Sequence, residues 1–97
     1  MVYGYVQDVP IKDAAYRSIV GKLAEGPLPG LVVHLCVRRP DGGLRYIDVW
    51  ESQDACDQAF RDLIHPAVYS TFTELGFTPD GEPSREVVEV LDVRLAD

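Results

Sequence analysis

Apolar and polar residues follow two repeating patterns along the chain, and these patterns predict the order of its secondary structure. Alternation or runs of β-favouring residues indicate strands over 2–6, 31–38, 44–51 and 85–95. Apolar residues recur at helical spacing over 11–23 and over 55–63, which indicates two amphipathic helices. The predicted order over residues 1–97 is β-α-β-β-α-β. This order is that of a single ferredoxin-like α+β domain with a four-stranded antiparallel sheet.

Capping residues, glycine and proline mark the ends of the first helix and the start of the second. Asp8 and Pro10 favour a helix start, because a carboxylate accepts from free N–H groups and proline suits a first turn. The glycine- and proline-rich segment 26–30 should end this helix. Ser52 is a good N-cap, so the second helix should begin directly after it.

A proline divides the second helical region. Pro66 lacks a backbone N–H and should break the helix that begins after Ser52. A shorter helix over 67–75 would then follow, with Gly76 as its stop. Residues 77–84 are rich in Pro, Gly and Asp and predict a loop before the last strand.

The two central strands are predicted to form a hairpin with a defined register. Asp-Gly and Gly-Gly tolerate the positive φ of tight turns, so 41–43 should be a three-residue loop. This loop would place His34 opposite Trp50 and Cys36 opposite Asp48. A slip by two residues would keep the same faces together but would change the partners.

The predicted sheet has one wholly apolar face and one mixed face. The apolar face would carry Leu31, Val33, Leu35, Val37, Ile47 and Val49. The mixed face would carry Val32, His34, Cys36, Tyr46, Asp48 and Trp50. Two helices can cover only one face, and an uncovered apolar face loses about 1.5–3 kcal/mol for each large side chain left in water. A second copy of the chain is the simplest cover, so we expect a homodimer.

Charge and composition exclude several classes of protein. The formal net charge is −7, which disfavours nucleic acid because phosphates attract a basic surface. No apolar run approaches the ~18 residues that a membrane span requires. Cys36 and Cys56 lie in unrelated elements without metal-ligand or CxxC spacing, so we expect free thiols and a cytoplasmic location.

Three residues of the mixed face are candidates for catalysis. His34 could exchange a proton near neutral pH, and Asp48 could hold its ring. Trp50 is the single tryptophan and could stack on an aromatic ligand. Structural roles are the alternatives: a core histidine that is satisfied by hydrogen bonds, an ion pair of Asp48 with Arg17 or Arg94, and a core-filling tryptophan.

Other side chains could complete a ligand pocket between the sheet and the helices. Ordinary packing is the alternative for each of them, and a helix-capping role is a further alternative for the histidine before Pro66. The expected ligand-binding residues are Tyr5, Tyr16, Phe60, His65 and Tyr69. Two histidines and scattered carboxylates give no ligand spacing for zinc, so no metal site is expected.

The chain resembles the dimeric α+β barrel superfamily, and within it the small antibiotic-biosynthesis-monooxygenase-like proteins. The resemblance rests on the β-α-β-β-α-β order and on Val49-Trp50-Glu51-Ser52 at the end of the third strand, directly before an amphipathic helix. It implies that two subunits join sheet to sheet. It also implies that each subunit keeps a pocket between its own sheet and helices, so that the mixed face looks toward the helices.

Some oxygenases of this family carry an asparagine on the first strand, a tryptophan on the third and a histidine in the second helical region. Trp50 matches the tryptophan, and His65 lies in the region of the histidine. The chain contains no asparagine, and Tyr3 or Tyr5 occupies that part of the first strand. The missing asparagine is a departure from the pattern of the family's best-known cofactor-free oxygen chemistry, and equally from that of its haem-degrading branch.

These observations predict a small enzyme that acts on an apolar or aromatic small molecule. It would work without a bound cofactor, either by oxidation or by a proton-transfer cyclisation. Trp50 would stack on the substrate, and His34 would move a proton while Asp48 orients it. The alternative is a non-catalytic small-molecule-binding or structural dimeric module that has the same fold.

Overall fold

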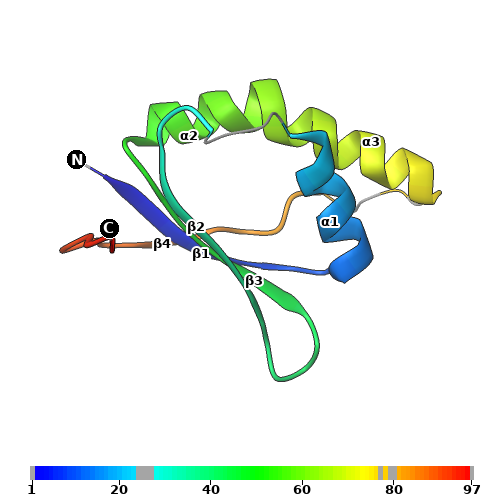
Figure 1. Ribbon diagram of the computed structural model, residues 1–97, viewed down its shortest axis with the longest axis horizontal. Coiled ribbons are helices and arrows are strands. Elements are labelled where there is room, and N and C mark those ends of the chain that lie inside the picture. Colours follow the sequence, from blue (N-terminus) through cyan, green and yellow to red (C-terminus); the bar gives the residue numbers. More distant parts are fainter. Residues whose placement is uncertain (1, 24–27, 77, 79–80, 97) are drawn as a thin grey trace.

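The chain folds as one sheet covered by helices, as the ferredoxin-like prediction requires (Figure 1). A computed structural model describes residues 2–23, 28–76, 78 and 81–96. Parts of the predicted segments 26–30 and 77–84 lie outside the described residues. In chain order the elements are β1 (Tyr3–Val9), α1 (Asp13–Lys22), β2 (Leu31–Arg38), β3 (Leu44–Trp50), α2 (Gln53–Ala59), η1 (Phe60–Ile64), α3 (His65–Leu75) and β4 (Glu86–Val88).

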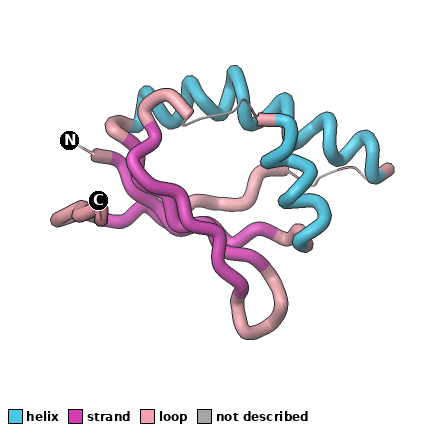
Figure 2. The backbone as a smooth tube through the Cα atoms, in the orientation of Figure 1, coloured by secondary structure: helices cyan, strands magenta, loops and turns pink. Residues whose placement is uncertain are grey.

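The sheet is antiparallel and has the order β2-β3-β1-β4. All the helices lie on one of its faces, and the β2–β3 hairpin projects beyond them (Figure 2). No helix of the described residues is long and apolar enough to cross a membrane. The helix-covered face is the mixed face of the sequence analysis, because Asp48 and Trp50 are buried there.

The first strand is longer than predicted, and the first helix begins later. β1 continues to Val9, which pairs with Leu44 and is buried in the core. Asp8 is a strand residue that pairs with Arg45, and its Oδ1 accepts from Arg45 Nε at 2.7 Å. The helix start that was expected near Asp8 therefore moves to Asp13.

The hairpin register differs from the prediction by two residues. Arg39 N donates to Gly43 O at 2.8 Å, so the three-residue loop is 40–42 and not 41–43. Gly42 has φ +91°, the conformation that glycine adopts most easily in such a loop. The shift places His34 opposite Asp48, and Cys36 opposite Tyr46.

A β-bulge moves one residue of the predicted outer face to the inner face. The register of β2 shifts between Leu31 and Val33, so one extra residue is inserted on this strand. Leu31 consequently pairs with Trp50 and packs against the buried cluster around it. The prediction that Leu31 belongs to the outer apolar face is therefore wrong.

Pro66 does not break the second helix, contrary to the prediction. The helix runs from α2 into α3 through the π-helical turn η1. His65 N donates to Phe60 O, five residues back along the chain. A proline in a regular α-helix clashes with the carbonyl four residues earlier and leaves it without a donor. The wider π turn just before Pro66 accommodates this defect while the chain stays helical.

The last strand is shorter than predicted. β4 lies at the sheet edge and pairs only with β1, over three residues instead of the predicted 85–95. Beyond it the side chains of Leu91 and Leu95 are 86% and 60% exposed. The Val- and Leu-rich run is therefore an exposed apolar segment and not a buried strand. Its Val90 side chain lies against Gly4, where an added Cβ would clash with Val90 Cγ2.

The core consists of two buried clusters under the helices. One surrounds Val9, Leu44 and Phe72, where α1 and α3 meet the sheet. The other surrounds Tyr5 and Trp50 beneath α2 and η1. Ser52 caps α2 as predicted, since its Oγ accepts from Ala55 N at 3.0 Å. A hollow lies beside these clusters and defines the candidate site.

Candidate functional site

A cavity of about 500 Å³ opens between the sheet and the helices. Aliphatic and aromatic side chains form most of its wall, with a few polar residues on β1, on the helix and among the described residues 78 and 81–83. The lining residues are Gln7, Val9, Pro10, Ile11, Ile19, Tyr46, Phe60, Ile64, His65, Val68, Tyr69, Phe72, Thr78, Gly81, Glu82 and Pro83. This size and composition are typical of a small-molecule pocket. Three of the five predicted ligand-binding residues, Phe60, His65 and Tyr69, line it.

The π turn explains why the helix presents aromatic side chains to the cavity. In η1 the residues five apart in sequence share one face, and the rings of Phe60 and His65 are 5.6 Å apart. The ring of Tyr69 continues this row at 5.9 Å from His65. Single π turns inside α-helices occur frequently at functional sites. Here the turn places the cavity's histidine beside an aromatic wall.

Hydrogen bonding fixes the segment that closes the cavity against the sheet. Gln7 is 3% exposed, and its Nε2 donates to Pro83 O at 2.8 Å. A buried amide without such a partner would be costly. The bond therefore holds the described residues 81–83 over β1, where Glu82 joins the wall.

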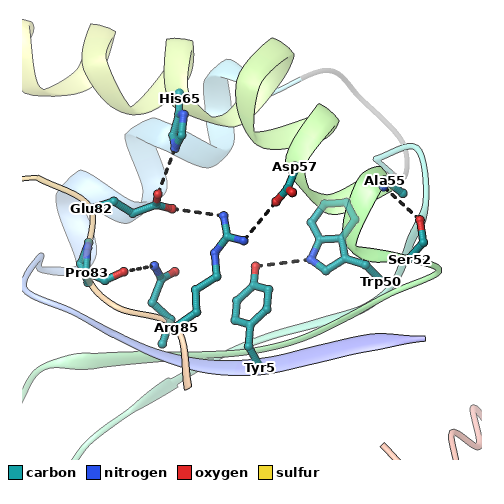
Figure 3. A network of polar contacts seen from close by, with 10 residues as sticks. Tyr5, Trp50, Ser52, Ala55, Asp57, His65, Glu82, Pro83 and Arg85 are labelled. Atoms are coloured by element: carbon teal, nitrogen blue, oxygen red, sulfur yellow. Dashed lines mark hydrogen bonds and ion pairs between the residues drawn. The ribbon is translucent and has the colours of Figure 1, made fainter. Parts of the chain in front are cut away.

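A charged network links that segment to the helix (Figure 3). His65 Nε2 lies 3.5 Å from Glu82 Oε2, and Arg85 Nη2 lies 3.4 Å from Glu82 Oε1. Arg85 also lies 3.4 Å from Asp57 of α2. Its guanidinium stacks over the Phe60 ring at 4.3 Å from the centroid, a cation–π contact. Glu82 is thus shared between a cavity histidine and a fixed arginine.

His34 and Asp48 meet as predicted, but away from the cavity wall. His34 Nδ1 lies 2.5 Å from Asp48 Oδ1, and the Tyr16 hydroxyl lies 2.8 Å from His34 Nε2. Burial and nearby Cys36 raise the pKa of Tyr16 to about 12, so its phenol stays protonated. None of the three polar residues lines the cavity. The alternative partners Arg17 and Arg94 do not pair with Asp48, whose partner is His34.

Tyr46 lies between the cavity and the hydrogen-bonded array of Tyr16, His34 and Asp48. Its ring centroid is 5.3 Å from that of His34 and 5.7 Å from that of Tyr16. Its side chain is half-buried and also forms part of the cavity wall. The mixed face of the sheet therefore supplies both the array and one side of the cavity, with Tyr46 shared by the two.

Trp50 and Tyr5 are core residues and do not reach the cavity. Trp50 is 1% and Tyr5 0% exposed, and Trp50 Nε1 donates to the Tyr5 hydroxyl at 3.3 Å. Burial and the charge of Asp48 raise the pKa of Tyr5. A ligand that stacked on Trp50 would have to displace Phe60, whose ring lies 6.1 Å from the indole. Trp50 therefore fills the core, which is the structural alternative to a ligand-stacking role.

Sequence reasoning missed four polar or aromatic residues around the cavity. Tyr46 was placed on the mixed face, but the predicted register gave no reason to select it. Gln7 lies beyond the predicted end of the first strand, and Glu82 and Arg85 lie at the irregular approach to the last strand. Only alternation on a longer first strand could have identified Gln7.

Comparisons with known proteins identify the fold. A candidate antibiotic biosynthesis monooxygenase from Chloroflexus aurantiacus J-10-fl superposes with a TM-score of 0.62 at 16% identity, covering 97% of each chain. The chain has the same α+β fold as this protein. Rv0793 from Mycobacterium tuberculosis superposes with a TM-score of 0.55 at 17% identity, covering 95% of this chain and 94% of that one. No family model and no curated protein matches the sequence.

Proposed function

We propose that this protein binds an apolar or aromatic small molecule in the cavity and acts on it by proton transfer, with His65 as the acid–base group. One observation supports this above all: a largely apolar cavity of about 500 Å³ has a histidine in its wall, paired with Glu82. A carboxylate partner can orient an imidazole and stabilise its protonated form.

His65 is a better candidate than His34 because only His65 lines the cavity. A general base must come within hydrogen-bond reach of the proton that it removes. His34 has both ring nitrogens engaged, with Asp48 and with Tyr16. It therefore serves as a link between α1 and the sheet and not as the group that meets the substrate.

The reaction is either a proton-transfer cyclisation or a cofactor-free oxidation in which the protein's part is proton removal. The similar protein from Chloroflexus aurantiacus J-10-fl is described as a candidate antibiotic biosynthesis monooxygenase, a description that agrees with the second of these reactions. Positioned acid–base groups typically contribute about 10²–10⁴-fold to a rate. One histidine in an apolar cavity is enough for such a step.

The test is to incubate the purified protein with phenolic and polyketide-like compounds, with and without oxygen, and to follow them by NMR. His65→Gln should abolish turnover, whereas His34→Gln should retain it if the variant stays folded. Full turnover by His65→Gln would overturn the assignment. Saturable binding with no chemical change in any sample would instead identify a non-catalytic binding module.

We further propose that the protein is a homodimer joined through the helix-free face of the sheet. Leu35 and Val37 are 50% and 38% exposed on that face, and Val88 at its edge is 40% exposed. Exposed apolar patches of this kind mark interfaces in proteins that remain in solution. The apolar residues Leu91 and Leu95 beyond β4 are also exposed and would extend the contact.

A further inference from the structure

Tyr46 differs from the other tyrosines of the covered face in the use of its hydroxyl. The hydroxyl of Tyr5 accepts from Trp50, and that of Tyr16 pairs with His34. The Tyr46 hydroxyl makes no hydrogen bond within the part of the chain that the structure describes. Its ring is fixed by edge and tilted contacts to His34 and Tyr16, and its side chain lines the cavity.

An unpaired phenol on a half-buried wall has a physical consequence. The hydroxyl is not among the fully buried polar atoms that lack a partner, so it reaches solvent, and a ligand acceptor in the cavity would take the place of water. Burial and nearby Cys36 raise the pKa of Tyr46, so the group is a hydrogen-bond donor at neutral pH. The array behind Tyr46 also limits the rotation of its ring.

We infer that Tyr46 is a substrate-contacting residue whose hydroxyl donates to a carbonyl oxygen of the ligand, so that the substrates are enolisable ketones on an apolar or aromatic skeleton. This inference rests on the proposed function of the cavity. Glu82 is the sole acidic group on the wall formed by the described residues, and no lysine or arginine lines it. An uncharged ketone therefore suits the cavity better than a carboxylate.

The proton step balances without an oxidant or a metal. His65 takes a proton from the carbon next to the carbonyl, the C–H electron pair forms a C=C bond, and the C=O π pair moves onto oxygen. The Tyr46 hydroxyl donates to the resulting enolate oxygen. The imidazolium charge is balanced by Glu82. Return of the proton to the carbon or to the oxygen regenerates neutral His65.

The test uses 2-tetralone and tetralin, which differ by the carbonyl group. We expect Tyr46→Phe to weaken 2-tetralone binding about 2- to 10-fold, the effect of one neutral hydrogen bond, and to leave tetralin binding unchanged. Tyr3→Phe is the matched control, since Tyr3 lies on the same face of the sheet but does not line the cavity. Unchanged tetralin affinity also shows that the variant keeps the folded cavity.

A second measurement follows deuterium exchange of the protons beside the 2-tetralone carbonyl. The wild-type protein should accelerate exchange, and Tyr46→Phe should reduce the acceleration on the order of 100-fold, as loss of an oxyanion donor does. Equal behaviour of Tyr46→Phe and the wild type in both assays would overturn the role of Tyr46 and leave the cavity proposal intact. Failure of both compounds to bind the wild type would instead contradict the proposed function.

Discussion

His34 and Asp48 face each other directly across β2 and β3, with Nδ1 of the imidazole 2.5 Å from Oδ1 of the carboxylate. The side chain of Asp48 is 4% exposed and that of His34 33%. The histidine is thus the partner that makes a buried carboxylate tolerable on the covered face, since an unpaired buried charge is expensive.

Removal of the His34 imidazole should destabilise the fold more than removal of the His65 imidazole. His34→Leu leaves Asp48 buried without its ion-pair partner and should lower the free energy of unfolding by about 1–3 kcal/mol. His65→Leu is the control, because Glu82 is 40% exposed and stays hydrated, so its cost should be below about 1 kcal/mol. Urea unfolding measures both, and equal losses would contradict the structural role of His34.

Stability should fall at alkaline pH because of a buried thiol. Burial raises the pKa of Cys56 from 9.0 to about 11. As the pH rises, the thiol ionises at a lower pH in the unfolded chain than in the folded protein. The contribution of the neutral thiol to the free energy of unfolding is therefore complete below pH 9 and is lost as the pH rises to about 11. The loss is on the order of 2–3 kcal/mol. Urea unfolding of the wild type and Cys56→Ala at several pH values should show a smaller alkaline loss in the variant. Identical pH dependence would contradict the assignment.

Pro66→Ala, which restores a backbone N–H at this position, should make the protein more stable but weaken its binding of ligands. Pro66→Ala permits a regular α-helix in place of η1 and should raise the melting temperature, because proline is the poorest residue inside a helix. The rotation would move Phe60 and His65 off their common face and weaken tetralin binding. Pro40→Ala in the hairpin loop is a control with the same substitution far from the helix. A variant that is more stable and binds equally well would show that the π turn does not shape the cavity.

The helix-free face of the sheet should mediate the association of two subunits. Leu35→Asp places a charge at the proposed interface, where Leu35 is 50% exposed in one subunit, so the variant should be a folded monomer. Leu75→Asp, at a 54% exposed position at the end of α3, is the matched control and should leave association unchanged. Light scattering at micromolar concentration distinguishes these states. A wild-type mass near 10.8 kDa would contradict the homodimer.

The order of elements and the covered face could be predicted from the sequence because alternation and helical spacing are local patterns. The register could not, because the residues of 40–43 permit a three-residue loop at either of two positions. The continuity of the helix across Pro66 depends on a rare π turn that no local pattern specifies. Trp50 was expected at the site, but α2 packs so closely on β3 that the indole is enclosed.

Much of the cavity wall could not be predicted because it depends on contacts between distant segments. Gln7 and Pro83 are far apart in sequence, yet their hydrogen bond fixes the segment that contributes Glu82. His65, Phe60 and Tyr69 were predicted as ligand-binding residues, and they line the cavity. Their common face depends on the π turn, whose presence required the structure.

A π turn is geometrically an α-helix that has one residue too many. Deletion of a single residue within 60–64 would restore regular winding and keep α2 in phase with α3, because the wide turn already absorbs the extra residue. Only the side chains of this turn that reach the cavity would change. The composition of the cavity wall is therefore adjustable by a one-residue change in helix length, without any substitution in the sheet. Natural relatives with and without that residue would present different side chains on an unchanged fold.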